Sequence, residues 1–314
     1  MGQLFGARLE LAGNEVALID TSEATIDALN RGGVTLVVDG SPVHTAVRAG
    51  RARDFSGEHD LVIVFTKGFH TADAVRSVDH LIGVATAGLT LQNGLGNGEV
   101  LAARFGPDAT WIGTTDFPAD LPEPGRVLTS DGGKVRFGAR HGRADERTAE
   151  LAALLNAAGL HATAVAEIEP IIWEKVAFNA ALNTLSAVAG RTVGQIAEDA
   201  DFRHLVGCVI DETIAVARSQ EIDVSRARIE SAVDNAFKHH RHHKSSMLQD
   251  REAGRRTESD FIGGAVVSRG RAGGVPTPVL STLTTLVKDP AGADGARRSP
   301  EPEPSTGAPR DGDS

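Results

Sequence analysis

Three polar side chains are spaced so that they share one face of a single helix. Lys175, Asn179 and Asn183 follow one another at intervals of four residues in the run IIWEKVAFNAALNTLSAVAG. The residues between them are almost all apolar, and polar groups on a buried helix are costly to desolvate unless they have partners. The stripe therefore indicates a polar pocket, although an amphipathic helix can carry such a stripe as its solvent face. The repeated asparagine favours the pocket, because a solvent face usually carries Glu, Arg and Lys.

Two further polar side chains directly follow predicted strands. Lys67 comes just after LVIVF (61–65), a short run rich in β-branched residues, which is typical of a strand buried in a parallel sheet. Asn93 follows the run LTLQ and precedes Gly94 in LQNGLGN. Ligands of open α/β sheets bind beyond the carboxyl ends of the strands. The two loops therefore predict a ligand-binding edge, although an exposed lysine and an ordinary Asn-Gly turn explain each loop separately.

A third polar run, KSSMLQDREAGRRTESDFIGG, follows later in the chain. Ser245 and Ser246 stand where a helix can begin, and Glu258 precedes an apolar helical stretch. In one interpretation, Thr257 caps that helix and Glu258 is an acid of its first turn. In the other, Glu258 faces Lys175 across a cleft and receives a substrate hydroxyl.

The beginning of the chain has part of the layout of a dinucleotide-binding site. A helix starts at Gly2, and the strand after it ends in an acid, Asp20. In βαβ units of this kind a pyrophosphate lies at the helix N-terminus and the carboxylate binds ribose hydroxyls. The first strand and the glycine-rich turn that normally precede the helix are absent, so we expect a sheet without its central member. The alternative is that Gly2 only follows the start residue and Asp20 only ends a strand.

The elements that position these residues form two regions and a tail. Up to about residue 166, strands alternate with helices, which predicts a Rossmann-type α/β nucleotide-binding domain with a parallel sheet. Within it, RVLTSDGGKVRFG (126–138) is predicted to be a hairpin that turns in DGG. Residues 167–288 have helical periodicity and predict an all-helical domain. Residues 289–314 are rich in proline and contain no large apolar side chain, which predicts a disordered tail.

The composition limits the partners of the chain. It has 314 residues and a formal net charge of -10, and a field of this sign repels nucleic acid. Cys208 is the only cysteine, which excludes an intramolecular disulfide and argues against a cysteine metal cage. The run FKHHRHHK (237–244) places imidazoles three or four residues apart, but it contains no acid or cysteine to complete a metal site. Without a membrane span or a signal peptide in the sequence, we expect a cytoplasmic protein with a small-molecule substrate.

Taken together, these motifs resemble the ketopantoate reductase family. The match rests on the order of Lys67 after a short strand, LQNGLGN, WEKVAFNAALN and SSMLQDREAGRRTESDFIGG, and it covers about residues 1–288. The resemblance implies a Rossmann domain followed by a helical domain. It also implies reduction of 2-dehydropantoate to pantoate with NADPH, a step toward pantothenate and coenzyme A. Gly2 matches only the last glycine of the family's G-x-G-A-x-G turn, so the chain resembles an N-terminally truncated member.

The resemblance assigns roles to the motif residues. Lys175 matches the catalytic proton donor. The family's substrate-binding residues correspond to Asn179, Asn183 and Ser246. Its residues around the cofactor correspond to Gly2, Lys67, Asn93 and Glu258. A cationic donor suits this reaction, because negative charge builds on the ketone oxygen and burial can lower the pKa of a lysine toward the working range.

Departures from the family's pattern keep alternatives open. NADPH-using members often place an arginine near the position of Asp20, and an acid there repels the 2′-phosphate and favours NADH. The family's Asn-Gly pair after the Lys-Asn-Asn helix is replaced by RTVG (191–194), which allows a related 2-keto acid as the substrate. A non-enzymatic remnant without the cofactor turn is a third alternative. A homodimer is compatible with all three.

Overall fold

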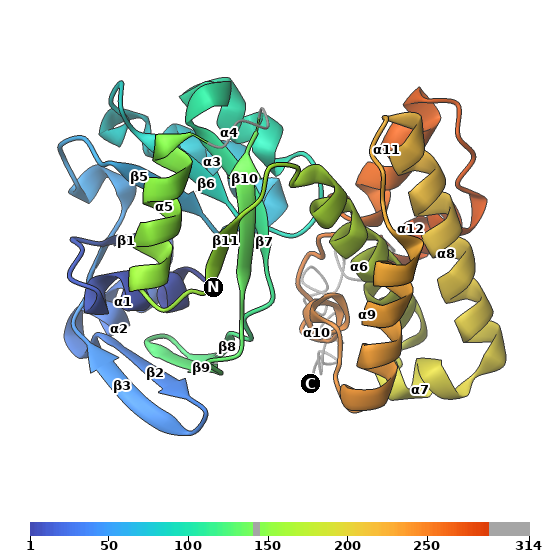
Figure 1. Ribbon diagram of the computed structural model, residues 1–314. Helices are drawn as coiled ribbons and strands as arrows, with labels where there is room; N and C mark the ends of the chain where they lie inside the picture. The colour runs from blue at the N-terminus through green and yellow to red at the C-terminus, as the bar shows by residue number, and fades with distance from the viewer. Residues whose placement is uncertain (141–144, 289–314) are drawn as a thin grey trace, which may run out of the picture.

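The chain folds into an α/β part followed by a helical part, which lie side by side in the computed structural model (Figure 1). The structure describes residues 1–140 and 145–288, so the predicted tail, 289–314, lies outside the described residues. Within the described ranges, all strands come before α6 and only helices follow. This confirms the predicted succession of a Rossmann-type region and an all-helical region. No helix in the described ranges is long and apolar enough to cross a membrane.

A five-stranded sheet carries the ligand-binding edge of the α/β part. Its strands, in spatial order, are β11 (Ala162–Ala164), β10 (Val135–Ala139), β7 (Thr110–Thr115), β6 (Ala87–Thr90) and β5 (Leu61–Val64). β10 is antiparallel to β7, and the other neighbours are parallel. The carboxyl ends of β5, β6 and β7 therefore lie at one edge, which the loops with Lys67, Asn93 and Asp116 extend. Helices that pack against this sheet are α3 (Thr71–Ser77), α4 (Asn97–Phe105) and α5 (Glu146–Ala157).

A separate pair of parallel strands lies beside the first helix. β1 (Ala17–Ile19) pairs with β4 (Arg48–Gly50), and no strand in the part of the chain that the structure describes joins this pair to the larger sheet. α1 (Gly2–Leu11) contacts β1, and α2 (Glu23–Gly32) contacts β4. Phe5 of α1 also packs against Phe65, just past β5, with ring centroids 4.6 Å apart. α1 therefore connects the two sheets through its side chains.

The predicted hairpin at residues 126–138 is wrong. Its second strand is β10, but its first, β9 (Arg126–Thr129), lies in another sheet between β2 (Val34–Val38) and β8 (Asp120–Glu123). β3 (Ser41–Thr45) forms the other edge of that small sheet. A DGG turn specifies a change of direction but not the partner of each strand. Phe137 is fully buried because β10 lies between β7 and β11, a burial that a two-stranded hairpin does not provide.

The central helix of the helical part is α6 (Glu169–Ala189). It contacts α8 (Ala200–Ser219), α9 (Arg226–His239), α10 (Ser246–Glu252) and α12 (Pro278–Val287). The remaining helices are α7 (Val193–Glu198) and α11 (Gly263–Ala272). Pro170 stands in the first turn of α6, where its missing N–H costs nothing, and Gly190 ends the helix in the left-handed conformation. Because the apolar side chains of α6 form the core of this part, its polar side chains are enclosed by other helices or by the α/β part.

Candidate active site

Lys175 reaches from the helical part to the end of β7. Its Nζ donates a hydrogen bond to the carbonyl oxygen of Thr115 at 2.6 Å. Burial lowers the pKa of Lys175 from 10.5 to about 8, an effect that the carboxylate of Asp116 opposes and Arg136 strengthens. A lysine with this pKa is mostly charged at neutral pH and releases its proton more readily than an exposed lysine.

Asn179 and Asn183 continue the polar stripe of Lys175 along α6. Asn179 is only 7% exposed, and Asn183 is partly exposed. The alternative that the stripe is a solvent face is therefore wrong, because the packing of α6 between other helices encloses it. Neither amide forms a hydrogen bond with another residue within 1–140 and 145–288. Two amides without protein partners, one and two turns from a cationic nitrogen, can orient a small polar ligand.

A second lysine, Lys67, joins the α/β part to the helical part. Its Nζ lies 2.7 Å from Oδ2 of Asp250 and 3.4 Å from Oε2 of Glu258. The other carboxylate oxygen of Glu258, Oε1, accepts a hydrogen bond from the backbone N–H of Gly68 at 3.0 Å. Glu258 therefore pairs with Lys67, whereas one of the two interpretations of the sequence placed it opposite Lys175.

Asp250 is a residue of this cluster that the sequence motifs did not single out. It is 4% exposed and accepts a second hydrogen bond, from Nε of Arg255, at 2.9 Å. Burial by itself lowers the pKa of Lys67, but the carboxylates of Glu258 and Asp250 outweigh this effect and raise the pKa. A signal for Asp250 exists in the sequence: it lies three residues after Met247, on the buried face of the short helix α10, where an acid needs a partner.

The turn before α11 closes on both loops of the ligand-binding edge. The backbone N–H of Leu95 donates to the carbonyl oxygen of Phe261 at 2.8 Å. A Cβ added to Gly68 would lie 2.6 Å from the ring of Phe261, and Gly94, at φ +90°, faces the Phe261 carbonyl without room for a Cβ. Glycine is therefore required at both positions. These contacts hold the loops that carry Lys67 and Asn93 against the helical part.

The first turn of α1 lies near the Lys67 loop. A Cβ added to Gly2 would lie 3.9 Å from Cβ of Phe65, at the carboxyl end of β5. The N-cap residue, Met1, makes no side-chain hydrogen bond to the first turn, so the N–H groups there have no side-chain acceptor. Asp20 follows β1 and accepts a hydrogen bond from the backbone N–H of Ser22 at 2.8 Å. A helix N-terminus for phosphate and a carboxylate for ribose fit a dinucleotide at these two points.

The two adjacent serines play different parts at the start of α10. Ser245 is the N-cap and is buried, whereas Ser246 is exposed on the first turn, and its side chain makes no hydrogen bond within the described ranges. The interpretation that a helix begins here is confirmed. Thr257 does not cap α11, which begins at Gly263, so Glu258 is not an acid of the first turn of that helix.

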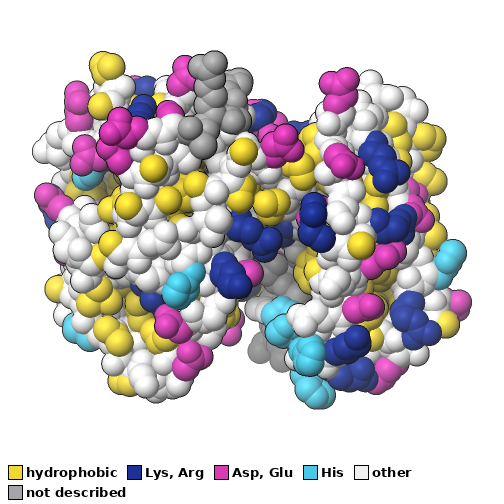
Figure 2. Space-filling view, in the orientation of Figure 1, with side chains coloured by type: hydrophobic (Ala, Val, Ile, Leu, Met, Phe, Trp, Pro, Cys, Tyr) yellow, Lys and Arg dark blue, Asp and Glu magenta, His cyan; other side chains and the backbone are white. Residues whose placement is uncertain are grey.

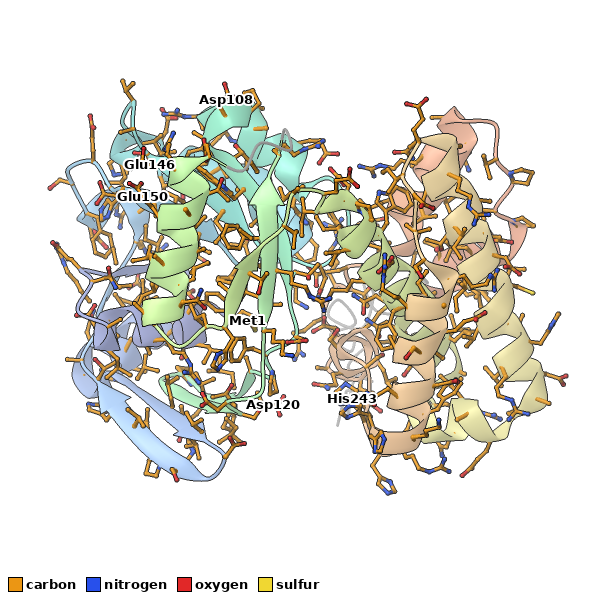
Figure 3. All side chains as sticks on the ribbon, in the orientation of Figure 1. Met1, Asp108, Asp120, Glu146, Glu150 and His243 are labelled. Atoms are coloured by element: carbon orange, nitrogen blue, oxygen red, sulfur yellow. The ribbon has the colours of Figure 1, made fainter. Side chains whose placement is uncertain are left out.

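The histidine run is a surface feature. α9 ends at His239, and residues 240–243 follow outside any helix with exposed side chains, so the three- and four-residue spacings of the run do not place its imidazoles on one helix face. Figure 3 shows His243 at the lower end of the helical part. The residues that the structure describes contain no group of three or more His, Cys, Asp or Glu side chains that could hold a metal.

Ion pairs tie the two parts together along the furrow between them, where Figure 2 shows Lys and Arg side chains gathered. Arg140 lies 2.8 Å from Glu169 at the start of α6, and Arg269 of α11 lies 2.9 Å from Glu99 of α4. These four residues also line a cavity of about 320 Å³ between the parts. Arg140 and Arg269 are therefore each paired with a carboxylate of the other part.

The chain is similar to proteins of one family along most of its length. Residues 1–142 match the family "Ketopantoate reductase PanE/ApbA", and residues 167–291 match "Ketopantoate reductase PanE/ApbA C terminal". A 2-dehydropantoate 2-reductase of Halobacterium salinarum is 32% identical over 289 residues, which cover 92% of this chain and 95% of that protein. The 2-dehydropantoate 2-reductase of Streptococcus pyogenes serotype M1 is 31% identical, with coverage of 91% and 94%.

Solved structures with this fold include both ketopantoate reductases and a mandelate dehydrogenase. A ternary structure of D-mandelate dehydrogenase with NADH and anilino(oxo)acetate has a TM-score of 0.85 at 28% identity, covering 90% of this chain and 93% of that one. The 2-dehydropantoate 2-reductase from Geobacter metallireducens GS-15 has a TM-score of 0.83 at 28% identity, with coverage of 90% and 94%. The two family matches cover most of the chain, and the relatives are more than 30% identical over more than 90% of it. The chain therefore belongs to the ketopantoate reductase family.

Proposed function

We propose that the chain catalyses the NAD(P)H-dependent reduction of 2-dehydropantoate to (R)-pantoate, a step in pantothenate and coenzyme A biosynthesis. The observation that carries the proposal is the environment of Lys175. A lysine with a pKa of about 8 stands at the carboxyl end of β7, followed by two asparagines whose amides have no partner within the described residues. This combination suits a small acid that carries a carbonyl and hydroxyl groups.

The proposed chemistry uses Lys175 as the proton donor. The nicotinamide, when bound, supplies a hydride to the carbonyl carbon of the substrate. Lys175 stabilises the negative charge that builds on the carbonyl oxygen and then gives it a proton. Asn179 and Asn183 orient the substrate from the same helix face without adding a competing charge, and Ser246 binds its carboxylate end.

Cofactor binding is proposed for four residues at the start of α1, at the sheet edge and in the turn before α11: Gly2, Lys67, Asn93 and Glu258. The first turn of α1, which begins at Gly2, provides backbone N–H groups for the pyrophosphate. Glu258 holds the Lys67 loop through the N–H of Gly68, so the loops around the nicotinamide are positioned before the cofactor arrives. We further propose a preference for NADH over NADPH, because the carboxylate of Asp20 repels a 2′-phosphate. The D-mandelate dehydrogenase of similar fold was solved with NADH, which supports this preference.

A second candidate substrate is another 2-keto acid. The similarity to a D-mandelate dehydrogenase, which was solved with NADH and anilino(oxo)acetate, an oxo acid with an aromatic substituent, favours this alternative. Steady-state rates with a panel of 2-keto acids separate the two candidates. If 2-dehydropantoate has the highest kcat/KM of the panel, the first proposal stands; if a keto acid with an aromatic substituent does, the second replaces it.

The test of the enzyme proposal begins with cofactor binding. Titration of NADH and NADPH with the purified chain should change the fluorescence of at least one of them. The absence of any change would leave the alternative of a non-enzymatic remnant. Lys175→Ala should then lower kcat by at least 100-fold while cofactor binding stays within a few-fold. Lys238→Ala, a change of an exposed lysine on α9, serves as the control and should leave kcat unaltered.

Three further points are proposals from the sequence. We propose that the chain divides near residues 166 and 167, in the connection between β11 and α6. A cytoplasmic location is proposed because the single cysteine suits a reducing compartment. A homodimer is the assembly that we would test first, by measuring the mass in solution.

A further inference from the structure

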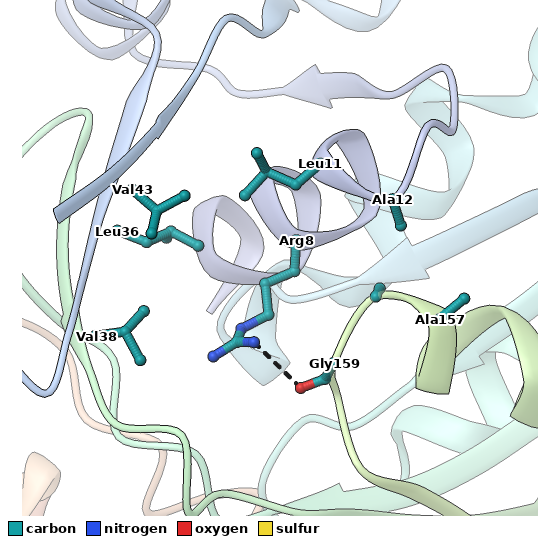
Figure 4. A pocket seen from close by; sticks show the side chains of 9 residues that line it. Arg8, Leu11, Ala12, Leu36, Val38, Val43, Ala157 and Gly159 are labelled. Carbon is teal, nitrogen blue, oxygen red and sulfur yellow. Dashed lines mark hydrogen bonds between the residues drawn. The ribbon is translucent and has the colours of Figure 1, made fainter. Parts of the chain in front are cut away.

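A cavity of about 260 Å³ lies beside the last turns of α1, at the opposite end of this helix from Gly2 (Figure 4). Its walls are apolar and come from three places: Leu11 of α1, Val38 and Val43 of the small sheet, and Ala157 at the end of α5. Arg8 is the single charged residue among the described residues that line it. Figure 4 shows the side chain of Arg8 extending from α1 into the middle of these residues. We name this space the Arg8 cavity.

The guanidinium of Arg8 is largely buried and only partly satisfied. Its side chain is 11% exposed. Nη1 donates to the carbonyl oxygen of Gly159 at 3.2 Å, and Nη2 donates to Oδ1 of Asp131 at 3.0 Å. Nε is buried and has no partner in the described part of the chain. A guanidinium has five N–H donors, so this one is still short of acceptors, and a buried donor without an acceptor is unfavourable.

Nη1 and Nη2 each make one hydrogen bond and each carry a second N–H, and the geometry points to a carboxylate as a further acceptor for these groups. Asp131 is 63% exposed and can return to water if another anion takes its place, because an ion pair with an exposed partner contributes little. A carboxylate in the cavity would instead meet a guanidinium that is itself only 11% exposed, and a hydrogen bond between two charged groups is stronger than one between neutral groups. The apolar walls require an apolar body on the same molecule.

We propose that the Arg8 cavity binds a small monocarboxylate with a branched apolar body. The volume of about 260 Å³ is slightly below the usual range of ligand pockets, which limits the ligand to a small molecule. The site is separate from the proposed active site, since it contains none of the residues assigned to substrate or cofactor. Because Arg8 and Gly2 belong to the same helix of ten residues, the ligand should stabilise the element whose first turn is proposed to receive the cofactor.

The probe for this proposal is 3-methylbutanoate, added to the full chain at about pH 7. Saturable binding should appear in isothermal titration calorimetry, and Tm should rise by about 2–4 °C at ten times the dissociation constant. Val43→Trp fills the cavity from a position that is 43% exposed on an edge strand, so the fold should tolerate it and binding should be lost. Val84→Trp, at a fully exposed residue, is the matched control and should bind normally.

Two comparisons identify the chemistry and the place of binding. The neutral analogue 3-methylbutan-1-ol and inorganic phosphate should each fail to raise Tm, because one lacks the charge and the other the apolar body. Arg8→Gln should weaken binding at least tenfold, whereas Lys175→Ala should bind 3-methylbutanoate as the unaltered chain does. The proposal is overturned if no saturable binding is found or if Val43→Trp binds equally well. It is also overturned if Lys175→Ala abolishes binding, which would assign the carboxylate to the active site.

Discussion

The pH dependence of turnover tests the role of Lys175 most directly. The fall in its pKa from 10.5 to about 8 corresponds to about 3 kcal/mol against the charged form. A lysine that donates a proton to the substrate must be charged at the start of the reaction. We therefore expect kcat/KM to be constant below about pH 7 and to fall tenfold per pH unit above about pH 8.

Two single substitutions should move this alkaline limb in opposite directions. Asp116→Asn removes the carboxylate that raises the pKa of Lys175, so the limb should move to lower pH. Arg136→Gln removes a positive charge that lowers the pKa, so the limb should move to higher pH. A partly screened charge contributes roughly 1 kcal/mol, which makes each displacement somewhat less than one pH unit. Asparagine can still accept the hydrogen bond that Asp116 receives from the backbone N–H of Lys134.

The assay is the oxidation of NADH or NADPH followed by absorbance, at constant ionic strength across the pH range. Asp108→Asn is the control and should leave the limb in place, because Asp108 is exposed and precedes the amino end of β7, whereas Lys175 contacts Thr115 at the carboxyl end of that strand (Figure 3 labels Asp108). The assignment of Lys175 as proton donor is refuted if Asp116→Asn and Arg136→Gln displace the limb in the same direction. It is also refuted if neither displaces it while Lys175→Ala keeps normal turnover.

Three further outcomes are expected. Between about pH 8 and 10.5, Lys175 carries its proton in the unfolded chain but has lost it in the folded chain, so the free energy of unfolding should rise with pH across this window. Lys175→Met should remove that rise, as measured by urea unfolding, and should increase Tm at pH 7. Gly94→Ala should cost roughly 1–3 kcal/mol in urea unfolding, because φ is positive and the Phe261 carbonyl occupies the space, whereas Gly96→Ala has open space and should cost less. Asp20→Ala should raise kcat/KM for NADPH relative to NADH; an unchanged ratio would mean that Asp20 does not contact the ribose.

The sequence predicted those parts of the site that depend on periodicity within one element. The four-residue spacing of Lys175, Asn179 and Asn183 predicts a shared helix face, and α6 carries all three on it. The short β-branched run before Lys67 predicts a parallel strand, and β5 pairs in parallel with β6. Both features are local, because they follow from the repeat of a helix or from the burial pattern of one strand.

The features that the sequence did not predict depend on which elements meet in space. The sequence predicts the turn at DGG, but not that β9 and β10 join different sheets. β10 lies between β7 and β11, and these strands bury Phe137. In the same way, the motif residue Glu258 pairs with Lys67, which is 191 residues away in the chain. Asp250 was overlooked because an acid within a short helix is usually a surface residue. Partner choice over such separations is a property of the tertiary structure.

The position of α6 makes it a lever for any rotation of the helical part against the α/β part. It begins at Glu169, where the contact with Arg140 anchors it to the α/β part, and it runs through the centre of the helical core. Lys175 is six residues from that anchor and Asn183 is fourteen, or about 9 and 21 Å along the axis. A small rotation of the helical part about this pivot would displace Asn183 roughly twice as far as Lys175. Opening for a substrate would therefore clear the asparagine end of the stripe first, while the proton donor stays close to the end of β7.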